Sequence, residues 1–71
     1  MQAPLYPHIR VRMKERDANA FEIINKVSSS MREHRVDHSE IDRFMSAAMS
    51  GSYADLKSVC RRFVKFQEGA R

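Results

Sequence analysis

Two histidines and one cysteine are the residues of this chain whose chemistry suits a metal ion. His34 and His38 are four residues apart, the spacing that places two imidazoles on one face of a helix, and Cys60 could supply a third ligand. The sequence between the histidines, however, predicts a break between two helices, and neither a Cys-x-x-Cys pair nor a fourth ligand is present. We therefore expect no metal and no other cofactor, and we interpret both histidines as solvated loop residues.

Nucleophilic and acid-base catalysis have no better candidates. The two arginines that follow Cys60 would lower the pKa of a reactive thiol, but Cys60 lies four residues after Leu56 and three before Phe63. This spacing places it on the apolar stripe of a helix and predicts a buried, slowly reacting side chain. Helix capping accounts for the carboxylates that could act as catalysts, which are Asp37, Glu40 and Asp55. We expect no catalytic residue and no enzyme activity.

Positive charge is the feature that could select a partner. The 71-residue chain has 13 lysines and arginines against 9 acidic residues, which gives a net charge of +4. Most of the cations are arginines, whose planar guanidinium groups bind phosphate in a two-pronged geometry. No long block of like charges occurs, so the charge alone does not identify a nucleic-acid-binding protein. The candidate nucleic-acid contacts lie on a predicted strand and near the C-terminus: Arg10, Arg12, Lys14, Lys57, Arg61, Arg62 and Lys65.

The first of these elements is a strand from His8 to Lys14. Cationic and apolar residues alternate strictly along it, which is the pattern of a half-buried strand with a basic outer face. A single strand cannot satisfy its own backbone groups and needs a second strand. That second strand is either the same segment of another subunit or the stretch from Phe63 to Gln67, where apolar and charged residues alternate again. Because a helical stripe also continues to Phe66, we favour the other subunit and expect a homodimer.

Three helices follow the strand, and the first two begin at capping sequences. Asp17 to Asn19 open the first helix, where Asn19 and Glu22 can form a capping box. Asp37 and Glu40 form the best-defined box, at the start of the second helix. Replacing Asp37 by alanine is therefore expected to cost about 1 kcal/mol of stability.

The third helix begins after Gly51, which we expect to end the second helix in the left-handed conformation, and is capped by Ser52. The cations expected on its exposed face are Lys57, Arg61, Arg62 and Lys65. The segment from Arg43 to Cys60 can be laid on a helix-turn-helix, in which this helix would read DNA. The fit is poor, because Lys57 occupies a position that should be buried and Asp55 would face the phosphates.

Several of these local sequences resemble a family of small bacterial proteins of uncharacterised function that also occurs on phages and other mobile elements. The similarity covers about residues 9 to 66 and rests on the strand, the Asn19-Ala20-Phe21 helix start, and the Ser50-Gly51-Ser52-Tyr53 turn. Family members have glycine where this chain has Ala18, so a glycine-dependent turn is not expected here. The resemblance implies a cytoplasmic helical domain and carries no activity or site to transfer.

Together the patterns predict a mainly α fold, with an N-terminal β-strand followed by a three-helix domain and, as the alternative to a longer third helix, a short C-terminal strand that pairs with the first. We expect a flexible segment over 1–7, the domain over 8–67 and a disordered tail over 68–71. A single cysteine and the lack of a long apolar run favour a cytoplasmic protein without membrane contact.

The function expected from the sequence is protein–protein interaction, with self-association foremost. Met45 and Met49 could line a groove for a partner helix, although methionines at such spacing are more often core residues. Nucleic-acid binding through the basic strand face or the third helix is the alternative. No small-molecule substrate is expected.

Overall fold

The computed structural model describes residues 3–14 and 18–68, which form two strands and three helices. In chain order these are β1 (Tyr6–Met13), α1 (Ala20–Glu33), α2 (His38–Met49), α3 (Tyr53–Phe63) and β2 (Val64–Glu68). The predicted fold class is confirmed, including the short C-terminal strand that pairs with the first. The expected opening of the first helix at Asp17 and the last residues of the expected tail, 69–71, lie outside the described residues.

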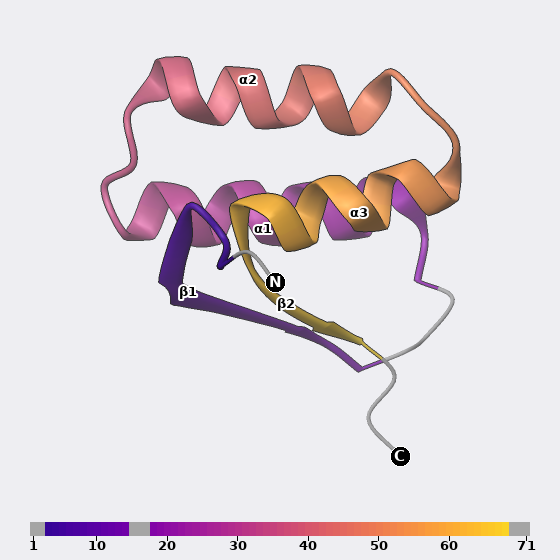
Figure 1. The fold of residues 1–71 in the computed structure, drawn as a ribbon, viewed down its shortest axis with the longest axis horizontal. Coiled ribbons are helices and arrows are strands. Elements are labelled where there is room, and N and C mark those ends of the chain that lie inside the picture. Colours follow the sequence, from indigo (N-terminus) through magenta and orange to yellow (C-terminus); the bar gives the residue numbers. More distant parts are fainter. Residues whose placement is uncertain (1–2, 15–17, 69–71) are drawn as a thin grey trace.

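The two strands pair in parallel, with Val11 opposite Phe66. Three helices that reverse direction in turn separate the strands, so the chain enters β2 in the same direction as β1 (Figure 1). Between Tyr6 and Arg10 the register shifts, and β1 bends in this region (Figure 1). A two-stranded sheet thus forms within one chain.

The favoured prediction that the third helix continues to Phe66 is wrong, because α3 ends at Phe63. Val64 has the extended backbone angles φ −134° and ψ 167° and begins β2 directly. Residues two apart point to opposite sides of a helix but to the same face of a strand. Only the strand can therefore bury both Val64 and Phe66, which are 0% and 7% exposed.

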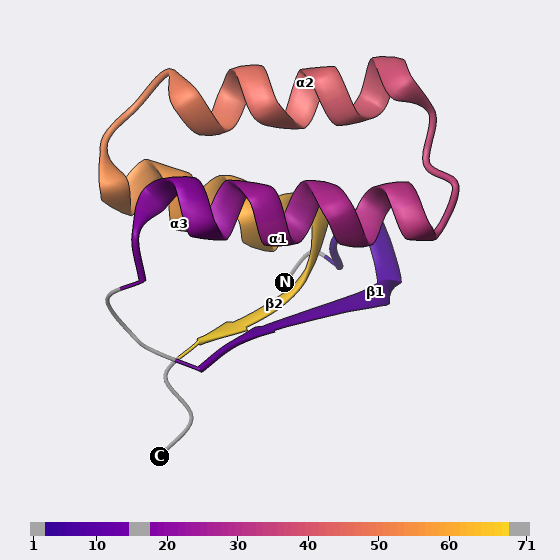
Figure 2. The same cartoon turned by 180° about the vertical axis from the view of Figure 1, so that it is seen from behind.

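All three helices lie on one side of the sheet, in two layers (Figures 1 and 2). Helices α1 and α3 are next to the sheet, and α2 packs on them from the side away from it. The core between these layers is apolar, and in it the rings of Phe44 and Phe63 meet edge to face with centroids 5.5 Å apart. The opposite face of the sheet is covered by none of the described helices (Figure 2).

Two of the three helices begin with complete capping boxes. In α1 the Phe21 N–H donates to Asn19 Oδ1 (2.8 Å) and Glu22 reaches back to the Asn19 N–H, as predicted. In α3 the Asp55 N–H donates to Ser52 Oγ at 3.2 Å, and the Ser52 N–H donates to Asp55 Oδ2 at 3.0 Å. Both boxes satisfy N–H groups that have no partner inside the helix.

The capping box predicted for α2 is wrong. Asp37 is the N-cap residue, but its side chain makes no capping hydrogen bond. The N–H of Glu40, which a capping side chain would bind, donates instead to the carbonyl oxygen of Asp37 at 3.0 Å. We therefore expect Asp37→Ala to cost less than the sequence suggests.

Among the described residues, the left-handed one is Arg35, with φ 61°, and not Gly51 as predicted. Arg35 follows the end of α1, where its N–H donates to the carbonyl of Arg32 and the Val36 N–H donates to that of Met31, the two bonds of a Schellman motif. Gly51 is instead required by close packing, because a Cβ there would lie 2.6 Å from Asp55 Oδ2.

Candidate nucleic-acid interface

The uncovered face of the sheet carries the exposed side chains of both strands. Inward-pointing residues of β1 and β2 are buried, and the residues between them are exposed. The register places Arg10 opposite Lys65 and Arg12 opposite Gln67. Two segments that are distant in sequence therefore contribute to one polar surface. We call this surface the sheet face and define it by the exposed strand residues Arg10, Arg12, Lys65 and Gln67, together with Lys14, which directly follows β1.

Among the described residues of the two strands, Glu68 is the only acidic one, and its carboxylate is engaged elsewhere. Glu68 pairs with the inward-pointing Met13. Its Oε2 lies 2.8 Å from Lys57 Nζ and its Oε1 lies 3.2 Å from Arg61 Nη2, both on α3. The four cations of the sheet face thus have no strand carboxylate among them, so their positive potentials add.

The cations predicted for the third helix are divided by the structure. Lys57, expected to be exposed, has a side chain that is only 16% exposed and lies between Glu68 and the ring of Tyr53, 4.6 Å from the ring centroid. Lys65 lies on β2 and not on the helix. Arg61 binds Glu68, and Arg62 is exposed. The carboxylate of Glu68 therefore offsets part of the positive charge of α3.

His8 was expected beside the strand cations, but the bend in β1 carries it toward the end of α1. Its ring is 5.6 Å from that of His34 and 6.4 Å from that of Tyr6, in edge-to-face geometry. His34 Nδ1 lies 2.8 Å from the Ser30 carbonyl oxygen.

Burial, together with the nearby Glu40, raises the pKa of Tyr6. In the described part of the chain no group of three His, Cys, Asp or Glu residues could hold a metal ion.

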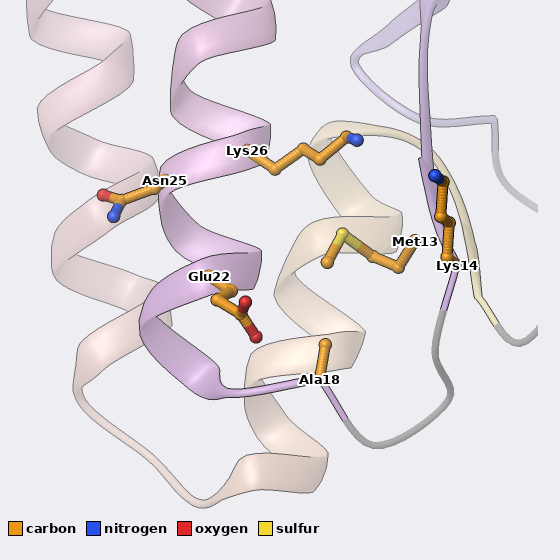
Figure 3. A pocket seen from close by; sticks show the side chains of 6 residues that line it. All are labelled: Met13, Lys14, Ala18, Glu22, Asn25 and Lys26. Carbon is orange, nitrogen blue, oxygen red and sulfur yellow. The ribbon is translucent and has the colours of Figure 1, made fainter.

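A further cation lies beside the sheet face, across the β1 edge. Lys14 and Lys26 line a hollow of about 500 Å³ between β1 and α1. Figure 3 shows the Lys26 side chain extending from α1 toward β1, whereas Asn25 points away from it. Lys26 was not among the predicted nucleic-acid contacts, because the sequence does not show that this residue of a helix lies close to a strand. Gln67 was also missed, although its spacing from Lys65 would place it on the same face once β2 is recognised.

A second, apolar hollow lies where the start of α1 meets the turn between α2 and α3. It encloses about 310 Å³. Within residues 3–14 and 18–68, three of the four exposed large apolar side chains border it: Phe21, Met49 and Tyr53, which are 68%, 56% and 39% exposed. The small residues Ala20, Ala48 and Gly51 also line it. The Tyr53 hydroxyl donates to the carbonyl of Ala18 and ties the two ends of this region together.

Cys60 is buried, as predicted, with an exposed fraction of 0%. Burial raises the pKa of its thiol to about 12, and the nearby Arg61 opposes this rise only in part. At neutral pH the thiol is therefore protonated, which is the form that does not act as a nucleophile.

Comparison of the chain with known protein families, curated proteins and solved structures found no match. None of the helices in residues 18–68 is long and apolar enough to cross a lipid bilayer.

Proposed function

We propose that this protein binds nucleic acid through the sheet face. The observation that carries the proposal is the parallel pairing of β1 with β2, which aligns Lys65 with Arg10 on an uncovered surface. Neither strand segment alone has this arrangement. Exposed cations that have no carboxylate among the described strand residues beside them attract a phosphate backbone and release its counterions.

The charges on the rest of the molecule favour the sheet face over α3 as the surface that binds nucleic acid. Glu68 lies within ion-pair distance of two cations of α3, so those side chains would have to exchange a close carboxylate for a phosphate. Helix α2, which lies farthest from the sheet, has acidic residues at Glu40 and Asp42 (Figure 1). A nucleic acid that approaches with its phosphates toward the sheet therefore meets the more positive side of the protein.

Fluorescence anisotropy with a labelled, mixed-sequence duplex at low salt tests the proposal. We expect binding whose affinity falls steeply as salt rises, with a log–log slope of about −3 to −4 if the four cations of the sheet face each contact a phosphate. The double variant Arg10→Gln/Arg12→Gln should bind at least tenfold more weakly and show a slope reduced by about 2.

The matched control is Arg32→Gln/Arg43→Gln, which removes the same charge from α1 and α2. Its affinity should stay within about threefold of the unmodified protein, because only the long-range potential changes. Equal losses in the two double variants would show that net charge alone attracts the nucleic acid. Absence of salt-sensitive binding at low salt would reject the proposal.

As a second candidate, we propose self-association through the apolar hollow bordered by Phe21, Met49 and Tyr53. The hollow combines a protruding aromatic ring with a lining of small residues. A symmetric contact between two copies uses the same patch twice, and a projection beside a recess makes such a patch complementary to itself. The earlier reason for a dimer, an unpaired strand, does not apply because β2 pairs with β1.

Sedimentation equilibrium at micromolar concentrations tests this second candidate. We expect a dimer that Phe21→Ser weakens by at least tenfold, because the substitution removes the most exposed aromatic ring of the patch. Leu5→Ser is the matched control, because Leu5 is 60% exposed and does not line the hollow. A monomeric protein at the highest concentration measured would rule out self-association through this patch.

A further inference from the structure

We infer that the nucleic acid is double-stranded DNA and that at a preferred sequence the sheet face enters its major groove. There Gln67 contacts one base edge, and Arg12 exchanges the phosphate that it contacts on mixed-sequence DNA for another base edge. This inference rests on the proposed function and specifies the form of the ligand. It follows from the shape of the sheet, from the residue types on its outer face and from their register.

The residue types of the sheet face favour a duplex over a single strand. Single-stranded DNA and RNA are commonly bound by stacking bases on aromatic side chains. The sheet face has no aromatic residue among its described members, and the bend in β1 turns Tyr6 and His8 toward the end of α1. Double-stranded RNA fits no better, because side chains cannot reach into its deep, narrow major groove.

The dimensions of the sheet match the major groove of B-form DNA. That groove is about 12 Å wide and admits a two-stranded ribbon, whose strands are about 4.8 Å apart. The sheet has only two strands, and the neighbouring helices α1 and α3 both lie on its inner side (Figure 2). The outer surface is therefore two strands wide. Residues two apart along a strand are separated by about 6.6 Å, close to two base-pair steps. Arg10 and Arg12 therefore follow the rise of the duplex.

The register places two different base-reading groups side by side. Arginine donates a bidentate pair of hydrogen bonds to guanine, and glutamine forms a bidentate pair with adenine. Arg12 and Gln67 are directly paired across the strands, and both side chains are exposed. Gln67 is the uncharged member of the sheet face and gives it a means to discriminate bases.

A cation beside the sheet, Lys26, is placed to meet a backbone that borders the groove. Lys26 of α1 lies across the hollow from Lys14 on the β1 side (Figure 3). On the β2 side the surface hollow that Arg12 and Gln67 line also contains Arg61 and its ion-pair partner Glu68. Lys26 would help to fix the depth and direction of the sheet in the groove, while base contacts set the sequence.

Selection from a random-sequence duplex library, followed by dimethyl sulfate protection of the selected duplex, tests the inference. Dimethyl sulfate methylates guanine N7, which faces the major groove. We expect an enriched motif of a few base pairs and protection of at least one guanine in it. Gln67→Ala should reduce the preference for one base position by about tenfold and leave binding to mixed-sequence DNA within about twofold.

Arg12→Lys keeps the charge and removes the bidentate fork, so it should relax a different position, a guanine, by a similar factor. Lys65→Arg is the control that alters a cation of the same face and should leave the Gln67-dependent position unchanged. Salt-sensitive binding without enrichment and without N7 protection would overturn the inference while leaving the proposed function intact. No binding to any of these duplexes at low salt would reject both.

Discussion

The cations of the sheet face and those of α3 are similar in type and number, yet the structure gives them different surroundings. Lys57 and Arg61 share the carboxylate of Glu68, at 2.8 and 3.2 Å. Arg10 and Lys65 are neighbours on a surface whose strand carboxylate points to the other side. The availability of a cation for an external phosphate thus depends on where the nearest carboxylate lies, which counting charges along the sequence does not show.

Charge reversal at two nearby positions is expected to separate these regions most strongly. Lys65→Glu places a carboxylate opposite Arg10 and should weaken duplex binding by about thirtyfold, since it both removes one phosphate contact and neutralises another. Arg62→Glu, three residues earlier on α3, makes the same change in charge and should have an effect of about threefold or less. Binding titrations at one low salt concentration measure both. A larger loss for Arg62→Glu would reverse the assignment of the surfaces.

Removing the carboxylate beside α3 should make the two regions more alike. Glu68→Gln is expected to cost about 1 kcal/mol of stability, because Lys57 and Arg61 each lose an ion pair. The loss of one negative charge should raise affinity for the duplex by about twofold to fivefold. Urea unfolding and anisotropy measure the two effects. Unchanged stability would show that the Glu68 ion pairs do not hold β2 against α3.

The N-terminal cap of α3 allows stability to be changed at a distance from the sheet face. Ser52→Ala should cost about 1 kcal/mol because it breaks the bond from the Asp55 N–H, whereas Asp37→Ala should cost only a few tenths because no capping bond is lost. Ser58→Ala, within α3, is the control for the serine-to-alanine change itself. Thermal unfolding ranks the three variants, and duplex binding below the melting transition should not change. Equal costs for Ser52→Ala and Asp37→Ala would contradict the observed capping pattern.

The smallest expected effect concerns a cation that belongs to neither region. Arg35 has a left-handed backbone, so Arg35→Gly should relieve strain and raise stability by about 0.5 kcal/mol. Arg32→Gly, in the last turn of α1, should have the opposite sign, since glycine weakens a helix. Chemical denaturation measures both variants. Arg35→Gly also removes one positive charge, and duplex binding should nevertheless stay within about twofold if the sheet face is the binding surface.

Local sequence patterns were sufficient for most of the fold. Capping residues located α1 and α3, and strict alternation located β1 and identified its inner face. Patterns at the ends of helices were less reliable. At the start of α2 the Glu40 N–H donates to the carbonyl oxygen of Asp37 and not to its side chain. Gly51 lies where a Cβ would collide with Asp55, and it does not adopt the left-handed conformation that was predicted for it. From the sequence alone, Val64 and Phe66 are compatible with either a longer third helix or a strand, and only their contact with β1 distinguishes the two.

The candidate site was predicted only in part. Arg10, Arg12 and Lys14 follow from the alternation of β1, but the pairing that adds Lys65 and Gln67 is a contact between the two ends of the domain. The ion pairs that engage α3 depend on that same pairing, since β2 carries Glu68 to Lys57. One long-range contact therefore both assembles the sheet face and reduces the charge of the competing surface.

Titration of ¹⁵N-labelled protein with a short DNA duplex, followed by amide chemical shifts, tests the central claim most directly. The account predicts that the largest shift changes occur at Arg10 to Met13 and at Lys65 to Gln67, with small changes along α2. The changes should diminish as salt is raised. Shift changes concentrated on α3 between Lys57 and Arg62, with the strands unaffected, would contradict the claim that the sheet face binds nucleic acid.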